Sequence, residues 1–183
     1  MNKSLKILVA TDSLLVLAAG MFGPIYAIYV EDIGGDLLDA SIAWALFSFI
    51  SGIVIYVMGK LGDKVKEKEL MIVAGYVMTA IAYFGYIFIN SVFWLFGIQI
   101  LLGLASAIVT PAFDTVYSSH LDQGKQASQW GAWEGMSQIV TAIGALVGGV
   151  MVTLLGFNWL FGIMGSLSLF SGLYILFLPR KVL

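Results

Sequence analysis

Six long apolar runs take up most of this 183-residue chain, and they limit what it can fold into. A helix needs roughly 20 apolar residues to cross a bilayer, where it must satisfy its backbone hydrogen bonds internally. The composition agrees, because 60% of the residues are hydrophobic and only 11% are charged, against about 25% charged in soluble domains. We therefore predict an all-α integral membrane protein with transmembrane helices at residues 7–30, 41–58, 70–89, 92–118, 129–155 and 158–178.

The segments between these runs are short and carry turn and charge signals, so we expect a single six-helix transmembrane domain over residues 1–183. A cleaved signal peptide is not expected, because the first run contains Asp12 and continues to residue 30. There is no cysteine, no phosphate-binding glycine loop, no nucleophile elbow and no metal-binding His or Cys cluster. The sequence thus predicts no enzyme, no cofactor, no metal site and no nucleic-acid partner.

The distribution of basic residues predicts the orientation in the membrane. If the six helices alternate in direction, one face carries every Lys and Arg: Lys3, Lys6, Lys60, Lys64, Lys66, Lys68, Lys125, Arg180 and Lys181. The positive-inside rule assigns this face to the cytoplasm, so both termini are expected there. The acidic segment of Glu31, Asp32, Asp36 and Asp39 then faces outward.

A shift of 87 residues indicates an internal repeat of about 5–90 on about 92–178. It aligns the helix ends and places Pro24 on Pro111. Three helices are an odd number, so the second triplet starts from the opposite side of the membrane, giving a 3+3 inverted repeat. Such repeats are typical of secondary transporters, whose substrate sites lie near Gly or Pro interruptions of helices. The candidates are Gly20, Gly23 and Pro24, then Thr110 and Pro111, although Gly and Pro also serve packing alone in membrane helices.

The segment GKLGDK, with Gly59, Leu61, Gly62, Asp63 and Lys64, resembles the loop motif of the major facilitator superfamily. The six-helix topology resembles the N-terminal half of that family over the entire chain. The chain departs from the family where Lys66 replaces a Gly, where Glu67 replaces a basic residue, and where Gln99 replaces an Arg of the fourth helix. Residues 144–149 resemble the antiporter motif with Ala145 in place of Pro, a spacing that equally fits close helix packing.

The resemblance implies a partner, because family members have two such halves. We expect a second copy in a parallel homodimer that works by alternating access between the two sides of the membrane. The resemblance further implies that Asp63 of one copy caps the start of the fifth helix, near residues 128–130, of the other while the cytoplasmic side is closed. The gate is therefore expected at the GKLGDK segment.

Polar residues inside the predicted helices mark a candidate cavity. Residues on the fourth helix recur at steps of three or four and share one face, and polar groups in a membrane must face protein or water. Asp12, about 10 Å along the first helix, could exchange a proton, pair with a cationic substrate, or simply bond its neighbours. The predicted cavity residues are Asp12, Gly23, Pro24, Tyr26, Gln99, Ser106, Thr110, Asp114 and Tyr117.

A second set on the fifth helix is small and polar, and we predict that it lies at the interface between copies: Glu134, Gln138, Gly144, Gly148 and Gly149. Asp114 and Glu134 lie near helix ends, where they could also just reach water. The favoured function is a half-size, ion- or proton-coupled secondary transporter of a small solute, with lipid and a second six-helix half as partners. The alternatives are one half of a split or longer transporter, and a non-transporting membrane scaffold or receptor.

Overall fold

The computed structural model describes residues 3–179, which are helical apart from short connections. Six helical stretches in this range are long and apolar enough to span a membrane, and this confirms the predicted fold class. Arg180 and Lys181, which the sequence analysis places on the basic face, lie outside the described residues. The elements are α1 (Lys3–Phe22), η1 (Gly23–Ile25), α2 (Tyr26–Asp32), α3 (Leu37–Gly62), α4 (Lys68–Tyr86), α5 (Val92–Ser119), α6 (Gln126–Leu155) and α7 (Phe157–Leu176).

The first predicted helix is divided, and the second is longer than predicted. The first span comprises α1, the 3₁₀ turn η1 and α2. Helix α3 begins at Leu37 because Asp36 and Asp39 form a capping box: the Asp39 N–H donates to the Asp36 carboxylate at 2.9 Å, and the Asp36 N–H donates to the Asp39 carboxylate at 3.0 Å. Each carboxylate satisfies a backbone donor that a helix start leaves without a partner.

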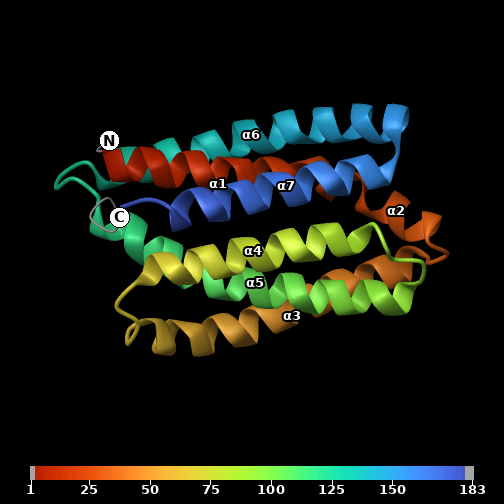
Figure 1. The fold of residues 1–183 in the computed structure, drawn as a ribbon, viewed down its shortest axis with the longest axis horizontal. Helices are drawn as coiled ribbons and strands as arrows, with labels where there is room; N and C mark the ends of the chain where they lie inside the picture. The colour runs from red at the N-terminus through yellow and green to blue at the C-terminus, as the bar shows by residue number, and fades with distance from the viewer. Residues whose placement is uncertain (1–2, 180–183) are drawn as a thin grey trace.

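The helices form two groups that meet mainly where α4 packs on α7, and α2 also contacts α3 (Figure 1). Helix α1 packs on α6 and α7, whereas α5 packs on α3 and α4. Contact between α4 and α7 joins the two groups. Helices α3 and α6 are the least covered of the six spans, and both expose large apolar side chains along their length. This exposed apolar surface is appropriate to a protein surrounded by lipid.

The two ends of the bundle differ in charge. The α3–α4 and α5–α6 connections lie at the end where α1 begins and α7 ends, on the left of Figure 1. This end carries the basic residues of the described chain, including Lys60 and Lys64. The opposite end carries the α2–α3 connection with its acidic residues, including Asp36 and Asp39.

Glycines allow α1 and α6 to approach each other closely. A Cβ atom on Gly144 would lie 2.7 Å from the Leu17 carbonyl oxygen, and one on Gly148 would collide with the backbone of Met21. Small residues at such crossings let helix backbones meet, which is how membrane helices gain packing energy. Gly144 and Gly148 are thus buried against α1 of their own chain, so the prediction that they lie between copies is wrong for these two.

We expect Gly144→Ala and Gly148→Ala to lower the free energy of unfolding by about 1–3 kcal/mol, because the added methyl group meets backbone that cannot repack. Gly149→Ala is the matched control, since a Cβ at that position meets nothing within 4 Å. It should leave stability unchanged or raise it slightly through helix propensity. Thermal unfolding in one detergent measures all three, and equal melting temperatures would contradict the close α1–α6 contact.

Candidate functional site

The first span is interrupted at Gly23–Ile25, as the sequence predicts. Pro24 occupies the first turn of η1, where its missing N–H leaves no helical hydrogen bond unmade. Both Gly23 and Pro24 are exposed. The corresponding prediction for the fourth span is wrong, because α5 runs without a break through Thr110 and Pro111. There the hydroxyl of Thr110 donates back to the Ser106 carbonyl at 2.9 Å, within the helix.

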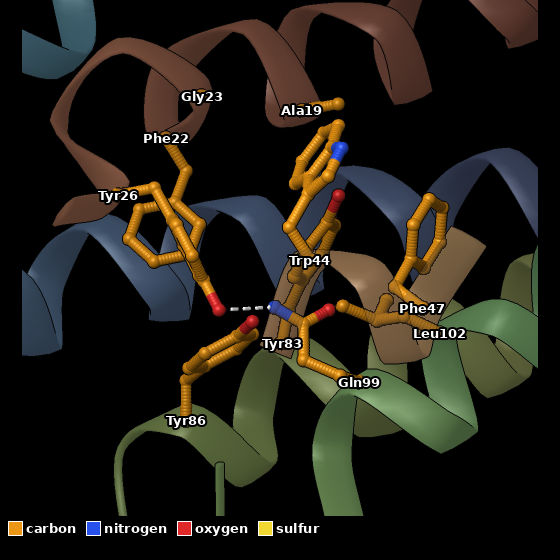
Figure 2. A pocket seen from close by; sticks show the side chains of 10 residues that line it. All are labelled: Ala19, Phe22, Gly23, Tyr26, Trp44, Phe47, Tyr83, Tyr86, Gln99 and Leu102. Atoms are coloured by element: carbon orange, nitrogen blue, oxygen red, sulfur yellow. Dashed lines mark hydrogen bonds between the residues drawn. The ribbon is translucent and has the colours of Figure 1, made fainter. Parts of the chain in front are cut away.

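A cavity of about 170 Å³ lies beside this interruption (Figure 2). Its walls come from α1, α3, α4 and α5 and from the interruption itself. Most of the lining is aromatic, and no lining side chain carries a formal charge. We call it the aromatic cavity; it is lined by Ala19, Phe22, Gly23, Tyr26, Trp44, Phe47, Tyr83, Tyr86, Gln99 and Leu102.

The polar centre of the aromatic cavity is a hydrogen bond between two predicted site residues. The Gln99 amide nitrogen donates to the Tyr26 hydroxyl oxygen at 2.6 Å. Gln99 is on α5 and only 3% exposed, whereas Tyr26 is the first residue of α2. The bond therefore ties the segment after the interruption to the fourth span.

A second cavity of about 270 Å³ adjoins the first, and we call it the acidic cavity. The two share four lining residues: Ala19, Phe47, Tyr83 and Leu102. The acidic cavity brings together three predicted residues, Asp12 from α1 with Ser106 and Thr110 from α5. The sequence thus anticipated one wall of each cavity, whereas the contributions of α3 and α4 were not predicted.

Asp12 is held by two donors from other helices. The Trp133 indole N–H on α6 donates to one carboxylate oxygen at 2.8 Å, and the Tyr76 hydroxyl on α4 donates to the other at 3.4 Å. Asp12 itself is 9% exposed. Two further acids, Asp114 and Glu134, interact with it electrostatically. A single carboxylate on α1 therefore links three spans and also lines a cavity.

Neither Tyr76 nor Trp133 was assigned to this site by the sequence analysis. A usable signal did exist, since buried Tyr and Trp side chains normally find a hydrogen-bond partner. Among residues 3–179, few buried side chains are acceptors, and Asp12 is the only buried acid. This signal does not show which helices surround α1, so it does not identify the partners of Asp12.

Tyr117 does not belong to the cavity wall, so that prediction is wrong. Its side chain is 0% exposed, and its hydroxyl donates to the Gln129 backbone carbonyl at 2.6 Å. It packs among Phe113, Trp130 and Trp133, where α5 meets the start of α6. The face of α5 that carries the predicted cavity residues therefore packs against different elements along its length. Asp114 is only partly buried.

The GKLGDK segment lies at the end of α3, and Asp63 is its exposed C-terminal cap residue. An acid at this position is unfavourable for the helix itself, because the C-terminus of a helix dipole is negative. At the same end of the bundle, α6 starts at Gln126, and its N-cap residue Lys125 makes no side-chain cap hydrogen bond. Residues 126–128, which follow, are exposed. The stability of α3 therefore does not explain why an aspartate occupies position 63.

The part of the predicted interface that remains on the outer surface is Glu134, Gln138 and Gly149. Glu134 and Gln138 are exposed, one helical turn apart, within the apolar span of α6. Gly149 is partly exposed. Exposed polar side chains at this depth require protein or water beside them, because lipid cannot satisfy their hydrogen bonds.

These observations define a multi-pass membrane protein built as one six-helix bundle, with a few polar residues in a largely apolar interior. Residues 11–182 match the family model described as Major Facilitator Superfamily, and the chain belongs to that family. The match confirms the resemblance to this superfamily that the GKLGDK segment and the six-helix topology indicated.

Three relatives illustrate the similarity. An uncharacterized MFS-type transporter from Methanocaldococcus jannaschii is 22% identical, over 94% of this chain and 45% of the relative. A multidrug resistance protein MdtG from Salmonella typhimurium is 24% identical, over 91% of this chain and 42% of the relative. A multi-drug resistance efflux pump PmrA homolog from Lactococcus lactis is 28% identical, over 86% of this chain and 40% of the relative. The chain thus spans less than half the length of these relatives.

We expect a double-mutant cycle of Asp12→Leu and Trp133→Phe to give a coupling energy of about 0.5–3 kcal/mol, the range for residues in direct contact. Either change alone removes the 2.8 Å bond and leaves its buried partner unsatisfied. Unfolding in detergent measures the cycle. Trp130→Phe is the control, because Trp130 packs on Trp133 but makes no hydrogen bond with Asp12 within the described chain. Equal coupling for both tryptophans would refute the bond as the link between α1 and α6.

Proposed function

We propose that this chain is a half-size secondary transporter of a small solute, working by alternating access. One observation carries the proposal: two adjoining cavities, one of which is lined by a carboxylate, lie inside an otherwise apolar bundle. A scaffold protein would have no need to keep Asp12 both buried and beside an open cavity, since an unpaired charge in a membrane is costly. The transporter names of the relatives support the same function.

The helix packing supports an inverted repeat. Exchanging the first span with the fourth, the second with the fifth and the third with the sixth converts the α3–α5 contact into the α6–α1 contact. The same exchange converts the α4–α5 contact into α7–α1 and leaves α4–α7 unchanged, and all five contacts occur. We infer a 3+3 arrangement whose pseudo-twofold axis lies near the α4–α7 contact. A substrate site near the middle of the membrane is the expected result of such a repeat.

A second six-helix unit completes the transporter in this proposal, and a second copy is the simplest supplier. The exposed Glu134 and Gln138 of α6 require a polar neighbour within the membrane. Asp63 and the uncapped start of α6 lie at the same end of the bundle, as an intersubunit latch requires. A twofold axis along the membrane normal would place Asp63 of each copy against α6 of the other. The alternative is a different C-terminal half, since the chain spans less than half the length of its relatives.

We propose the cytoplasm for the end that carries Lys60 and Lys64, following the positive-inside rule. Both termini then face the cytoplasm, and the interruption in the first span lies toward the outside. Asp12 lies on the cytoplasmic side of the two cavities, where it can take up or release a cation or proton. Gain or loss of a charge at Asp12 would change its bonds to Trp133 and Tyr76, and so the link between α1, α4 and α6.

Proteoliposomes with an imposed pH gradient test the proposal. A panel of radiolabelled aromatic and aliphatic solutes should include at least one that the wild-type protein accumulates in response to the gradient. Asp12→Asn should abolish gradient-driven accumulation, because it removes the only charged group that lines either cavity. Asp32→Asn, an exposed acid at the end of α2, is the control and should behave as wild type. Unchanged accumulation with Asp12→Asn would eliminate Asp12 as the coupling group.

Native mass spectrometry in nanodiscs, at several protein concentrations, tests the latch. We expect a dimer that weakens on Asp63→Ala, because the change removes the anion proposed to cap α6 of the other copy. Lys66→Ala, an exposed residue of the same connection, is the control and should leave the dimer intact. A monomer at every concentration would reject the homodimer and direct attention to a different second half.

A further inference from the structure

The aromatic cavity has the size, lining and unused hydrogen-bonding groups of a binding site. We propose that it binds one uncharged aromatic ring that carries a hydroxyl or amide group, and that this ring is part of the transported solute. As a substrate class, the inference rests on the proposed transport function. As a binding site, it depends only on one six-helix unit, because all ten lining residues belong to one chain.

The volume limits the occupant to a single ring. A cavity of about 150 Å³ with an apolar lining is known to accept benzene, and the aromatic cavity measures about 170 Å³. One six-membered ring with a small substituent fits this space, whereas a fused three-ring system does not. Any larger part of the solute would have to extend into the adjoining acidic cavity, which opens past Ala19 and Leu102.

The walls favour an aromatic occupant. Phe22, Tyr26, Trp44, Phe47, Tyr83 and Tyr86 surround the cavity. Their mutual contacts already use edge-to-face geometry: Phe22 meets Tyr26 at a centroid distance of 5.4 Å and Tyr86 at 5.2 Å. A further ring can join this arrangement at the 4.5–7 Å separations that aromatic pairs prefer.

Five lining residues carry an uncharged polar group, and several of these groups are free to bond a ligand: Tyr26, Trp44, Tyr83, Tyr86 and Gln99. Gln99 uses its amide nitrogen on Tyr26, while its amide oxygen accepts no hydrogen bond from the described residues and points away from Tyr26 in Figure 2. The hydroxyls of Tyr83 and Tyr86 likewise donate to no group within residues 3–179. The Gln99 amide oxygen is not among the fully enclosed, unpartnered side-chain atoms of the described chain, so it faces the open cavity. A ligand hydroxyl or amide N–H would satisfy it.

The aromatic cavity differs from the acidic cavity in that none of its lining residues is charged. A cationic ring would be drawn to Asp12, which lines only the acidic cavity. The chemistry around Gln99 offers one acceptor oxygen and up to three phenolic donors, from Tyr26, Tyr83 and Tyr86. This set matches a neutral group that can both donate and accept, such as a phenol hydroxyl or a carboxamide.

Fluorine NMR in nanodiscs tests the proposal with three probes that share one ring: 4-fluorophenol, 4-fluorotoluene and 4-fluorophenyltrimethylammonium. Empty nanodiscs correct for partitioning into lipid. We expect saturable binding of 4-fluorophenol about tenfold tighter than that of 4-fluorotoluene, the upper range for one hydrogen bond. The cationic probe should bind more weakly than 4-fluorophenol. Equal binding of the phenol and toluene probes, or preference for the cation, would overturn the proposal.

Matched variants assign the preference to the aromatic cavity. Gln99→Leu should remove the preference for the phenol, and Tyr86→Phe, which deletes a single hydroxyl from a residue that lines the aromatic but not the acidic cavity, should reduce it even if Gln99→Leu fails to fold. Ser166→Ala, at an exposed position on α7 that lines neither cavity, is the control and should leave the preference unchanged. A preference that survives both Gln99→Leu and Tyr86→Phe would place the binding elsewhere and reject the site.

Binding and transport are measured apart, so the two proposals fail differently. Selective phenol binding without any gradient-driven accumulation in proteoliposomes would retain the site and reject transport. Gradient-driven accumulation of other solutes without selective phenol binding would retain transport and reject this site.

Discussion

Hydrocarbon cannot hydrogen-bond, and this constraint underlies each feature described above. Backbone groups satisfy themselves in six helices, and the first span leaves the α-helical geometry only at Gly23–Ile25, where a proline needs no donor. Side-chain hydroxyls in the spans donate mostly to carbonyls of their own helix, as Thr110 does. Where hydroxyls bond across closed parts of the bundle, they donate to backbone carbonyls, as Tyr29 does to Tyr86 and Ser171 to Thr11. Within the described residues, the side-chain to side-chain bonds between helices are those of Asp12 with Trp133 and Tyr76, and of Gln99 with Tyr26. Asp12, Gln99 and Tyr26 all line a cavity.

Hydropathy predicted the helices well because each span must satisfy the bilayer by itself, whatever its neighbours. The same locality explains the errors at helix ends: the Asp36–Asp39 capping box extends α3 beyond its apolar run, a polar signal that hydropathy alone does not weigh. The interruption at Pro24 and the continuity at Pro111 also differ for a local reason. Both prolines lie eight residues before the end of their span, but Pro24 follows Gly23, whereas Pro111 follows Thr110. Membrane helices tolerate a proline such as Pro111 when neighbouring groups accommodate it.

The candidate site was predictable only in part, because periodicity shows which residues share a face but not what covers that face. Ser106 and Thr110 do line the acidic cavity, yet Tyr117 on the same face of α5 packs against α6. Gly144 and Gly148 had the spacing of a packing surface, and the structure supplies α1 as the partner rather than a second copy. The partners of Asp12 come from α4 and α6, far away in sequence. Such contacts depend on the order of helices around the bundle, which no local pattern contains.

Helix α1 connects the two cavities, and this gives the arrangement a mechanical consequence. Asp12 and Phe22 are ten residues apart, about 15 Å along the helix axis. At one end Asp12 is tied to α6, the helix with the exposed polar face; at the other, the interruption leads to Tyr26 and its bond to α5. A solute that occupies the aromatic cavity must share Gln99 with Tyr26, and a cation or proton at Asp12 must compete with Trp133. Both events act on the first span, Asp12 before its interruption and Tyr26 after it, so binding at one end bears on the contacts at the other. In the proposed alternating-access cycle, coupling requires that solute and ion alter one element whose two positions favour opposite sides of the membrane.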